Sequence, residues 1–367
     1  MPAPRIGLES PAGFVDGLGP LDDIFLRWRA AAPPPPPPAS PLSWQKLLWP
    51  VAAQSLDPAV DALILATTKG DIARQVAWMR AADAATPAPD APPTLGSSLA
   101  ELLDACNLHD TPAWVVSTAC SSGLVALIDA AIAVQQGQLS RVLVAAADVH
   151  DAFTRDGFHA LKALSPSGAC RPFDRHRDGL ILGAAAAACI VAPLNQNSLC
   201  EITGFGISND ASHMTAPDRQ ARGLLRAIHA ALRLPALTPT DIDALLLHGT
   251  GTRYNDAMEA AAINALFPPP LPPPPVTAVK GLIGHTLGAS GLIEALLATH
   301  MIAHNTLPPI VGLQDPEYPA LPTASNLSTP LHRPIRHLLK TASGFGGMNA
   351  ALLLSRIDSS IHSRIDA

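Results

Sequence analysis

The sequence is poor in aromatic and charged side chains. Phe, Trp and Tyr make up 4% of its 367 residues and Asp, Glu, Lys and Arg make up 15%, whereas hydrophobic residues make up 48%. This composition excludes a chain that is disordered for want of apolar residues. Alanine, leucine and valine must therefore fill the core. The length favours two domains or one large duplicated domain.

The sequence also lacks an excess of basic residues. Its formal net charge is −6, and no block of Lys and Arg occurs. We therefore expect no nucleic-acid partner. A small local basic patch that docks an acidic partner stays compatible with this charge.

Cysteine is scarce and irregularly spaced. The odd number of thiols and the absence of a C-x-x-C pair exclude a disulfide scaffold, and they favour reduced thiols and a cytoplasmic location. The five cysteines are Cys106, Cys120, Cys170, Cys189 and Cys200.

Long hydrophobic runs are missing as well. The N-terminal "MPAPRIGLESPAGF" lacks the order of a signal peptide. The apolar stretch "GLILGAAAAACIVAPL" is shorter than the roughly 20 residues of a membrane span. We expect a buried strand there and no membrane span.

Proline gathers in two tracts, Pro33 to Pro38 and Pro268 to Pro275. Such tracts are stiff and cannot join a helix or a sheet ladder. We interpret both as surface connectors, and a proline-recognising partner is the alternative.

Short apolar runs alternate with segments of helical length. This pattern predicts an α/β fold with mainly parallel or mixed sheets covered on both faces. The helix expected at 121–137 is apolar almost all round, with only Asp129 charged, so it should lie buried between two sheets. The expected strands are "ALILATT", "AWVVSTA", "RVLVAAAD", "AAAAACIVAP", "EITGFGIS", "ALLLHGT" and "AALLLSR", and the other expected helices are 218–233, 256–267 and 291–304.

Cys120 lies where a strand is expected to meet that buried helix, in "VVSTACSSG". Unpaired N–H groups and the helix macrodipole favour a thiolate at such a position. A thiolate is the nucleophile of covalent catalysis, and the small neighbours Ser121, Ser122 and Gly123 should leave room for a substrate. A small core residue is the plainer interpretation, and the other four cysteines keep it.

Two histidines lie in similar settings rich in Gly and Thr. His248 stands in "HGTGT" and His285 in "GHTLGASG", each after an apolar run. Together with Cys120 they suggest one site assembled from distant segments. A zinc site is the rival interpretation, but the spacing of the three residues matches no zinc motif, so we expect no metal.

These motifs together resemble the β-ketoacyl-ACP synthases of the elongating Cys-His-His type, within the thiolase-fold superfamily. The resemblance runs from about residue 60 to residue 356. It implies a five-layer αβαβα fold of two pseudo-duplicated halves with a buried central helix pair. The halves would be 1–195, with the nucleophilic cysteine and a shortened N-terminal cap, and 196–367, with both histidines. The motifs are "STACSSG", "ALSPSGACRPFDRHRDGLILG", "DASHMTAPD", "LLLHGTGTRYNDAMEA", "VKGLIGHTLGASGLIEA" and "SGFGGMNAALLL".

The resemblance implies decarboxylative Claisen condensation of an acyl-enzyme with malonyl-ACP, an acyltransferase reaction. Cys120 would accept the acyl group, while His248 and His285 would bind the malonyl thioester and Lys280 would order them. The partners would be an acyl carrier protein and a second ketosynthase-like subunit, identical or different. The substrates would be attached to the phosphopantetheine arm of the acyl carrier protein, and no further cofactor would be needed.

The resemblance also implies roles around these four residues. The backbone N–H groups of Cys120 and Phe345 would form the oxyanion hole. The supporting carboxylates would be Asp256, Glu259 and Glu294, the phosphopantetheine-binding residues Thr250, Thr252 and Thr215, and the gating residues Phe345, Gly344 and Gly346.

Related proteins carry different residues at these positions. Synthases that start chains from CoA esters usually have Asn in place of His285, and degradative thiolases have a second catalytic cysteine near the C-terminus. Chain-length factors have lost the nucleophile, whereas this chain keeps Cys120. A partner subunit of the chain-length-factor kind, with little activity alone, is the alternative function.

Three features depart from the family pattern. The region before Cys120 is short, and its opening strand is only faintly echoed in "RIGLESPAGF". Ala184 stands where the family has an acidic residue. The phrase "ILATTKGDI" resembles synthases of aryl-polyene and flexirubin-type pigment clusters, so the product could be a fatty acid, a polyketide or a pigment.

Overall fold

The computed structural model describes residues 4–30, 43–56, 60–83, 92–323, 331–332 and 334–358. The first half of the chain alternates strands with helices, and every expected strand and helix in it is present. It comprises β1 (Ile6–Val15), β2 (Gly19–Pro20), α1 (Leu21–Arg29), α2 (Trp44–Ser55), β3 (Ala62–Ala66), α3 (Ile72–Asp83), α4 (Leu95–Ala105), β4 (Ala113–Val116), α5 (Ser122–Gln135), β5 (Val142–Asp148), α6 (Ala152–Ala160) and β6 (Ala185–Pro193).

The second half repeats the alternation. Its helices α7, α8 and α10 confirm the three other helical ranges expected from the sequence. It comprises β7 (Cys200–Asn209), α7 (Arg222–Arg233), β8 (Ala244–Leu246), α8 (Arg253–Leu266), β9 (Val276–Thr277), α9 (Lys280–Ile283), α10 (Ser290–His304), β10 (Thr306–Leu307), β11 (Leu331–His332), β12 (His337–Gly344) and β13 (Met348–Ser355), with short 3₁₀ turns at Pro239–Asp241, Leu287–Ala289 and Phe345–Gly347.

The strand order shows that the two halves share one topology. The first half runs β4-β3-β5-β6-β1 and the second runs β9-β8-β12-β13-β7. In each, the three outer strands are parallel and the next two pairings are antiparallel. Antiparallel pairing of β1 with β7 joins the halves. The sheet is thus mixed, and the fold is the duplicated α/β architecture that the resemblance implies.

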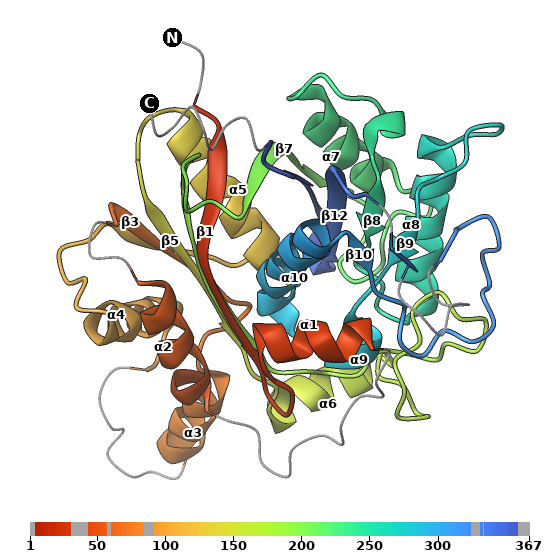
Figure 1. Ribbon diagram of the computed structural model, residues 1–367. Coiled ribbons are helices and arrows are strands. Elements are labelled where there is room, and N and C mark those ends of the chain that lie inside the picture. The colour runs from red at the N-terminus through yellow and green to blue at the C-terminus, as the bar shows by residue number, and fades with distance from the viewer. Residues whose placement is uncertain are drawn as a thin grey trace.

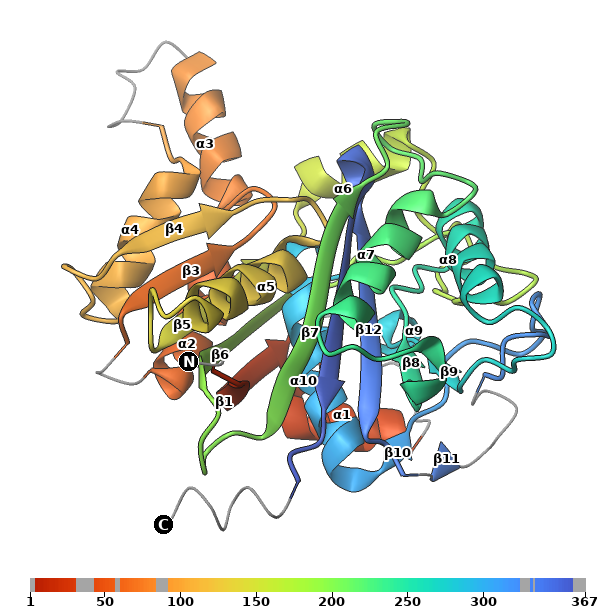
Figure 2. The same cartoon turned by 90° about the horizontal axis from the view of Figure 1, so that it is seen from above.

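The halves face each other across two central helices. Figures 1 and 2 show α5 and α10 side by side between the sheet halves, with α2, α3 and α4 outside one half and α7 and α8 outside the other. This is a five-layer αβαβα arrangement. Of the 14 residues of α5, 10 are buried, which confirms the helix expected between two sheets. Of the 15 residues of α10, 12 are buried.

Glycine permits the close approach of the central helices. A Cβ atom at Gly123 of α5 would lie 2.7 Å from the backbone N of Leu292, and one at Gly291 of α10 would lie 2.4 Å from the backbone N of Leu124. Backbone therefore packs on backbone at this crossing. Gly123 thus makes room for α10, and the expectation that it makes room for a substrate is wrong.

The N-terminal segment enters the centre of the sheet. "IGLESPAGFV" forms β1, which pairs with both β6 and β7. A register shift between Glu9 and Ala12 accommodates Pro11, which has no N–H to donate. The opening strand that the sequence only faintly echoes is therefore present.

The remaining expectations about single segments can now be placed. The alanine-rich apolar stretch forms the buried strand β6. The tract Pro268–Pro275 connects α8 to β9, as expected, and Pro33–Pro38 lies outside the described residues. All five cysteines are free and buried. Ala184 is buried and its carbonyl accepts the N–H of Asp16, at 2.9 Å, but nothing in the structure explains the missing acidic residue.

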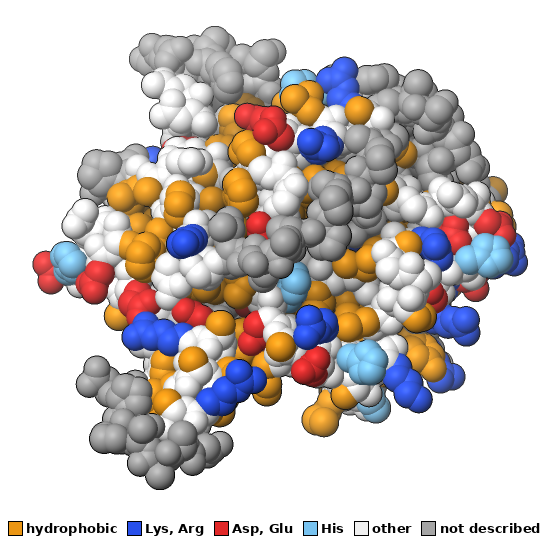
Figure 3. Space-filling view, turned by 90° about the horizontal axis from the view of Figure 1, so that it is seen from below, with side chains coloured by type: hydrophobic (Ala, Val, Ile, Leu, Met, Phe, Trp, Pro, Cys, Tyr) orange, Lys and Arg blue, Asp and Glu red, His pale blue; other side chains and the backbone are white. Residues whose placement is uncertain are grey.

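The described part of the chain contains no helix long and apolar enough to cross a membrane. Its surface carries both signs of charge. Figure 3 shows Lys and Arg side chains interspersed with Asp and Glu on one face. Large apolar side chains are also exposed, among them Met79, Phe153 and Leu161.

Candidate active site

Cys120 lies in a tight turn between β4 and α5. Ala119 adopts a left-handed conformation, with φ at 53°, which turns the chain before the helix. The hydroxyl of Ser121 donates to the carbonyl of Thr118 at 2.7 Å, and that of Ser122 donates to the carbonyl of Ala119 at 2.6 Å. The serines therefore brace the turn, and the expectation that they leave room for a substrate is wrong.

The thiol of Cys120 is almost fully buried, at 6% exposure. Burial raises its pKa to about 11, although Lys280 and Lys69 act in the opposite direction. The backbone N–H of Phe345 faces the sulfur and also acts to lower the pKa. Burial thus opposes the favoured thiolate that the sequence led us to expect in the protein without substrate.

His248 follows β8 and is held on every side. Its backbone N–H donates to Glu259 at 2.7 Å, and its carbonyl accepts from the ammonium of Lys280 at 2.7 Å. The same ammonium lies 3.2 Å from Nδ1 of the ring. Because an ammonium can only donate, Nδ1 is the acceptor and the proton of the neutral ring is on Nε2.

His285 is oriented in the same way by different groups. Its Nδ1 accepts from the backbone N–H of Leu287 at 3.1 Å and faces the Ser290 hydroxyl at 3.2 Å. Its own backbone N–H donates to Ile181 at 2.6 Å, and its carbonyl accepts from Gly183 at 3.0 Å. The segment "GLILG" therefore fixes the backbone of this histidine through two hydrogen bonds. Because Nδ1 is an acceptor, the proton of the neutral ring is again on Nε2.

The two imidazoles lie close together and stay neutral. Their ring centroids are 5.3 Å apart, with the planes at 85°. Burial, and after it the charge of Lys280, holds the pKa of both His248 and His285 well below the usual 6.5. The site thus presents two neutral N–H donors from side chains that are each 2% exposed.

The carboxylates expected behind the site hold its backbone. Glu259 accepts the N–H groups of His248 and Gly249, at 2.7 and 2.8 Å. Asp256 accepts the N–H of Thr250 at 3.0 Å and that of Phe173 at 2.9 Å. Burial raises the pKa of Asp256 to about 6. Both carboxylates lie on α8 and fix the turn that follows β8.

Lys280 is completely buried and paired with a carboxylate. Its Nζ lies 2.5 Å from Oε1 of Glu294, which is on α10. The resemblance led us to expect an ordering lysine, and this lysine indeed contacts His248 directly. Glu294 in turn keeps the ammonium charge compensated, as a buried cation requires.

A cavity of about 550 Å³ brings the expected substrate-facing residues together. Lys280, Asp256, Glu259 and Glu294 lie behind it, and Gly346 is not among its lining residues. Segments from distant parts of the sequence build this cavity, since Cys120 and Phe345 both reach it. From the expected site it is lined by Cys120, His248, His285, Thr215, Thr250, Thr252, Gly344 and Phe345.

A second cavity of about 670 Å³ also reaches Cys120. Both cavities share Cys120, Phe158, Leu161 and Phe345. The rings of Phe158 and Phe345 stack with their centroids 5.8 Å apart. These two rings stand where the cavities meet, as a gate would.

Gly344 brings the chain before Phe345 onto the backbone of Cys120. A Cβ atom at Gly344 would lie 3.0 Å from the carbonyl O of Thr118 and 3.1 Å from the backbone N of Cys120. The N–H groups of Cys120 and Phe345 can therefore lie on the same side of the thiol, which is the geometry that an oxyanion hole requires.

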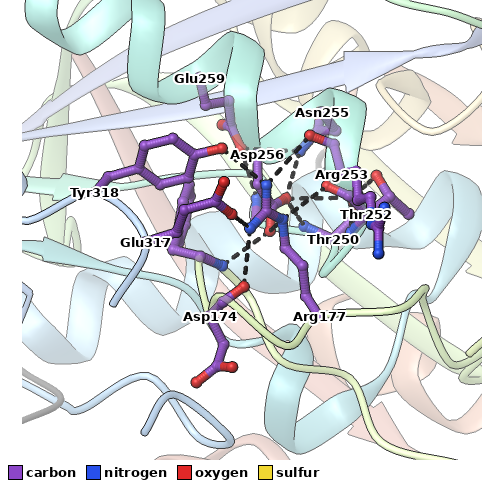
Figure 4. Close-up of polar contacts among 12 residues, drawn as sticks. Asp174, Arg177, Thr250, Thr252, Arg253, Asn255, Asp256, Glu259, Glu317 and Tyr318 are labelled. Carbon is purple, nitrogen blue, oxygen red and sulfur yellow. Dashed lines mark hydrogen bonds and ion pairs between the residues drawn. The ribbon is translucent and has the colours of Figure 1, made fainter. Parts of the chain in front are cut away.

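Sequence reasoning missed a buried arginine beside this site. Arg177 is 3% exposed, and its guanidinium donates to the hydroxyl of Tyr318 at 2.8 Å and pairs with Glu317. It also lies 3.7 Å from Asp256 and donates to the carbonyl of Thr252 at 3.4 Å (Figure 4). The cluster "RPFDRHRDG" in an otherwise charge-poor chain was the available signal.

Sequence reasoning also missed Asp148, at the end of β5. This fully buried carboxylate accepts the N–H of Thr68 at 2.8 Å and that of Gly288 at 2.7 Å, and it pairs with Lys69 at 3.3 Å. It thus ties the first half of the chain to the turn after His285. An acidic residue closing the apolar run "VLVAAAD" was the signal.

Among the described residues, no group of three or more His, Cys, Asp or Glu side chains is arranged to hold a metal ion. Comparison with protein families matches residues 89–197 to the N-terminal domain of β-ketoacyl synthases and residues 199–314 to their C-terminal domain.

The chain belongs to the β-ketoacyl synthase family.

Curated relatives agree with this assignment. The chain is 33% identical over 255 residues to "3-oxoacyl-[acyl-carrier-protein] synthase 2" of Coxiella burnetii, which covers 66% of this chain and 61% of that protein. It is 33% identical over 258 residues to "Tetracenomycin polyketide synthase ketoacyl synthase alpha subunit" of Streptomyces glaucescens, which covers 67% of this chain and 60% of that protein. The chain thus spans about three fifths of the length of these relatives.

Solved structures of ketosynthases have the same fold. "The ishigamide ketosynthase/chain length factor" superposes with a TM-score of 0.85 at 23% identity, covering 97% of this chain and all of that one. A chain from the complex of the ketosynthase ApeO with its chain length factor ApeC, from Xenorhabdus doucetiae, gives a TM-score of 0.78 at 26% identity, covering 96% of this chain and 98% of that one.

Proposed function

We propose that the protein is an acyltransferase that condenses an acyl group, held on Cys120, with a malonyl thioester carried by an acyl carrier protein. The observation that carries this proposal is the meeting of one thiol and two neutral imidazole N–H donors in a single cavity. The relatives named as 3-oxoacyl-ACP synthases support it.

The first half-reaction transfers the acyl group to sulfur. Cys120 attacks the thioester carbonyl, the C–S bond to the carrier breaks, and the thiol proton leaves with the departing pantetheine sulfur. Because the resting thiol has a pKa of about 11, deprotonation must accompany attack. The N–H groups of Cys120 and Phe345 would stabilise the oxyanion, and each such donor typically contributes about 3 kcal/mol.

The second half-reaction forms the carbon–carbon bond. The malonyl group loses CO₂, and the electron pair of the broken bond forms an enolate whose oxygen accepts the Nε2–H groups of His248 and His285. The enolate carbon attacks the acyl–Cys120 carbonyl, the C–S bond breaks, and the released thiolate takes up a proton. Neutral donors suit this step, because an imidazolium would protonate the enolate and waste it.

We assign the two cavities to the two ends of the reaction. The cavity lined by Thr215, Thr250 and Thr252 would admit the phosphopantetheine arm, because hydroxyl groups match its amides. The larger cavity on the far side of Phe345 would hold the acyl chain, since its lining is largely apolar. The reaction needs no metal or redox cofactor.

The partners belong to the same proposal. Lys162 and Arg253 line the first cavity and would attract an acidic carrier protein. The exposed Met79, Phe153 and Leu161 would be covered by a second ketosynthase-like subunit, identical or different. The chain length factor ApeC, in its complex with the ketosynthase ApeO, is one example of such a partner. Pathway, cytoplasmic location and the residue 195 boundary stay predictions.

The test is a condensation assay with acyl-ACP and malonyl-ACP, run with the wild type, Cys120→Ala and His285→Ala. We expect condensation product only with the wild type and not with either variant, whereas His285→Ala should still be acylated on Cys120. Product from Cys120→Ala at the wild-type rate would contradict the proposal.

A partner-subunit function is the second candidate, favoured by the neighbours that contain chain length factors. The same assay distinguishes it when run with and without candidate ketosynthase subunits. A wild-type chain that is never acylated on Cys120, yet changes the product length of another ketosynthase, would establish this candidate in place of the first.

A further inference from the structure

A second buried lysine lies beneath the histidine pair, and the mechanism above does not use it. Lys340 is in the middle of β12, in "HLLKTASG", and is 0% exposed. Its backbone is paired on both sides, opposite Leu246 of β8 and Leu352 of β13. A charged side chain in such a strand is costly unless a specific partner compensates it.

That partner is the carboxylate that also serves Lys280. Nζ of Lys340 lies 2.5 Å from Oε2 of Glu294, while Nζ of Lys280 lies 2.5 Å from Oε1 of the same group. Lys340 also donates to the carbonyl of Thr341. One carboxylate on α10 is thus held between two ammonium groups, and all three side chains are at most 1% exposed.

The count of charges shows what Lys340 adds. Glu259 is the other fully buried carboxylate that acts on Lys340, and it holds the backbone of His248. The positive charges of two lysines balance the negative charges of two glutamates, whereas loss of Lys340 would leave one ammonium group for two carboxylates. The floor of the site would then carry a net negative charge next to both imidazoles.

A negative floor would oppose the proposed chemistry. It would favour protonation of the imidazoles, and it would repel the enolate oxygen. It would also leave Oε2 of Glu294 without its cation, so the carboxylate could turn away from Lys280. The charge of Lys340 already acts on both imidazoles in the structure, since it contributes to the lowered pKa of His248 and of His285.

We propose that Lys340 is a positioning residue that shares Glu294 with Lys280, and so keeps Lys280 on Nδ1 of His248 and prevents a net negative charge beneath both imidazoles. The part that concerns turnover rests on the proposed condensation, but the part that concerns imidazole ionisation does not. The charged and titratable groups that face this cluster are Glu259 on α8, His248 after β8, Lys280 on α9, Glu294 on α10 and His285 in the turn between α9 and α10. The thiols of Cys120 and Cys170 also interact with the charge of Lys280.

The experiment compares Lys340→Met, which is similar in length and uncharged, with the wild type. Titration of the two histidines, followed by NMR of labelled imidazoles, should show midpoints raised by about 1 pH unit, the usual size of such a charge effect. The imidazoles would still be neutral at neutral pH, but the same loss of positive charge should destabilise the enolate oxygen by a similar amount, so malonyl-ACP decarboxylation should fall by about tenfold. Acylation of Cys120 by acyl-ACP should change by less than about twofold, because that step forms no enolate at the imidazoles.

Two further variants complete the design. Lys340→Gln loses the charge but can still donate to Glu294, so it should raise the midpoints even if Lys340→Met does not fold. Lys46→Met removes an exposed lysine on α2 and should leave all readouts at the wild-type values.

Unchanged midpoints in a folded Lys340→Gln or Lys340→Met protein would overturn the inference, as would equal losses of acylation and decarboxylation. A wild type that does not decarboxylate malonyl-ACP would instead refute the proposed function, and the titration would still decide the role of Lys340.

Discussion

The crossing of α5 and α10 yields a sharp prediction, because a single methyl group placed there meets backbone. In Gly291→Ala the new Cβ would lie 2.4 Å from the backbone N of Leu124, 2.8 Å from its Cβ and 3.0 Å from its Cα. Non-bonded carbon contacts are comfortable at about 3.5–4.0 Å, so the helices must separate by roughly 1 Å.

The free-energy balance of this change is unfavourable. Alanine in place of glycine improves helix propensity by about 1 kcal/mol. Overpacking of a rigid core costs about 1–3 kcal/mol, and here the obstacle is backbone, which cannot rotate away. The separation would also loosen contacts along two helices that are buried over most of their length. We expect a net loss of up to about 2 kcal/mol in the free energy of unfolding.

Urea unfolding monitored by circular dichroism measures this loss. The matched control is Gly157→Ala on α6, where nothing lies within 4 Å of the added Cβ, and this variant should gain about 0.5–1 kcal/mol. Gly291→Ala should also slow condensation, because α5 follows Cys120 and α10 begins at Ser290, which contacts His285. A Gly291→Ala protein as stable as Gly157→Ala would refute the packing argument.

Three further predictions follow from the site. Gly344→Ala places a Cβ 3.1 Å from the backbone N of Cys120, so pre-steady-state acylation should fall about 100-fold, the usual loss for one oxyanion donor, without loss of fold. The pKa values of His248 and His285 are lowered on folding, so the unfolded chain takes up protons before the folded protein does as the pH falls below 6.5. The free energy of unfolding, measured with urea, should therefore decrease below pH 6.5 by up to about 1.4 kcal/mol per pH unit for each histidine. Burial raises the pKa of Asp256 from 3.8 to about 6, so this group has the opposite effect and stabilises the folded protein as the pH falls. Relative to Asp256→Asn, the free energy of unfolding of the wild type should rise by up to about 3 kcal/mol between pH 7 and pH 4. A stability difference between the two proteins that does not change with pH would contradict this raised pKa.

Local patterns in the sequence were sufficient for much of the fold. The apolar run 121–137 indicated a helix with no solvent face, and α5 is buried between the two sheet halves. The direction of strands was harder, because an alanine-rich run such as β6 reads the same in parallel and antiparallel pairing. The sequence did not predict β1, whose strand pattern is weak, or β12, which contains a lysine. Both form strands because they pair with strands that are distant in the sequence.

Some residues of the site could likewise be predicted from local sequence patterns, and others could not. The Gly and Thr settings of His248 and His285 marked the residues that now line one cavity with Cys120. The ionisation of Cys120 could not be read from the sequence, because it depends on how completely distant segments exclude water from the sulfur. Lys340 and Asp148 escaped notice for a related reason, since each matters only through a residue more than 40 positions away.

The central claim is that Cys120 carries the acyl group, and mass spectrometry of the peptide that contains it tests this most directly. After incubation with an acyl-ACP and no malonyl-ACP, we expect the mass of one acyl group on Cys120 and none on the other buried cysteines, Cys106, Cys170, Cys189 and Cys200. Addition of malonyl-ACP should then remove that mass and release CO₂. An acyl group that never forms on Cys120, or that stays there when malonyl-ACP is added, would contradict the account.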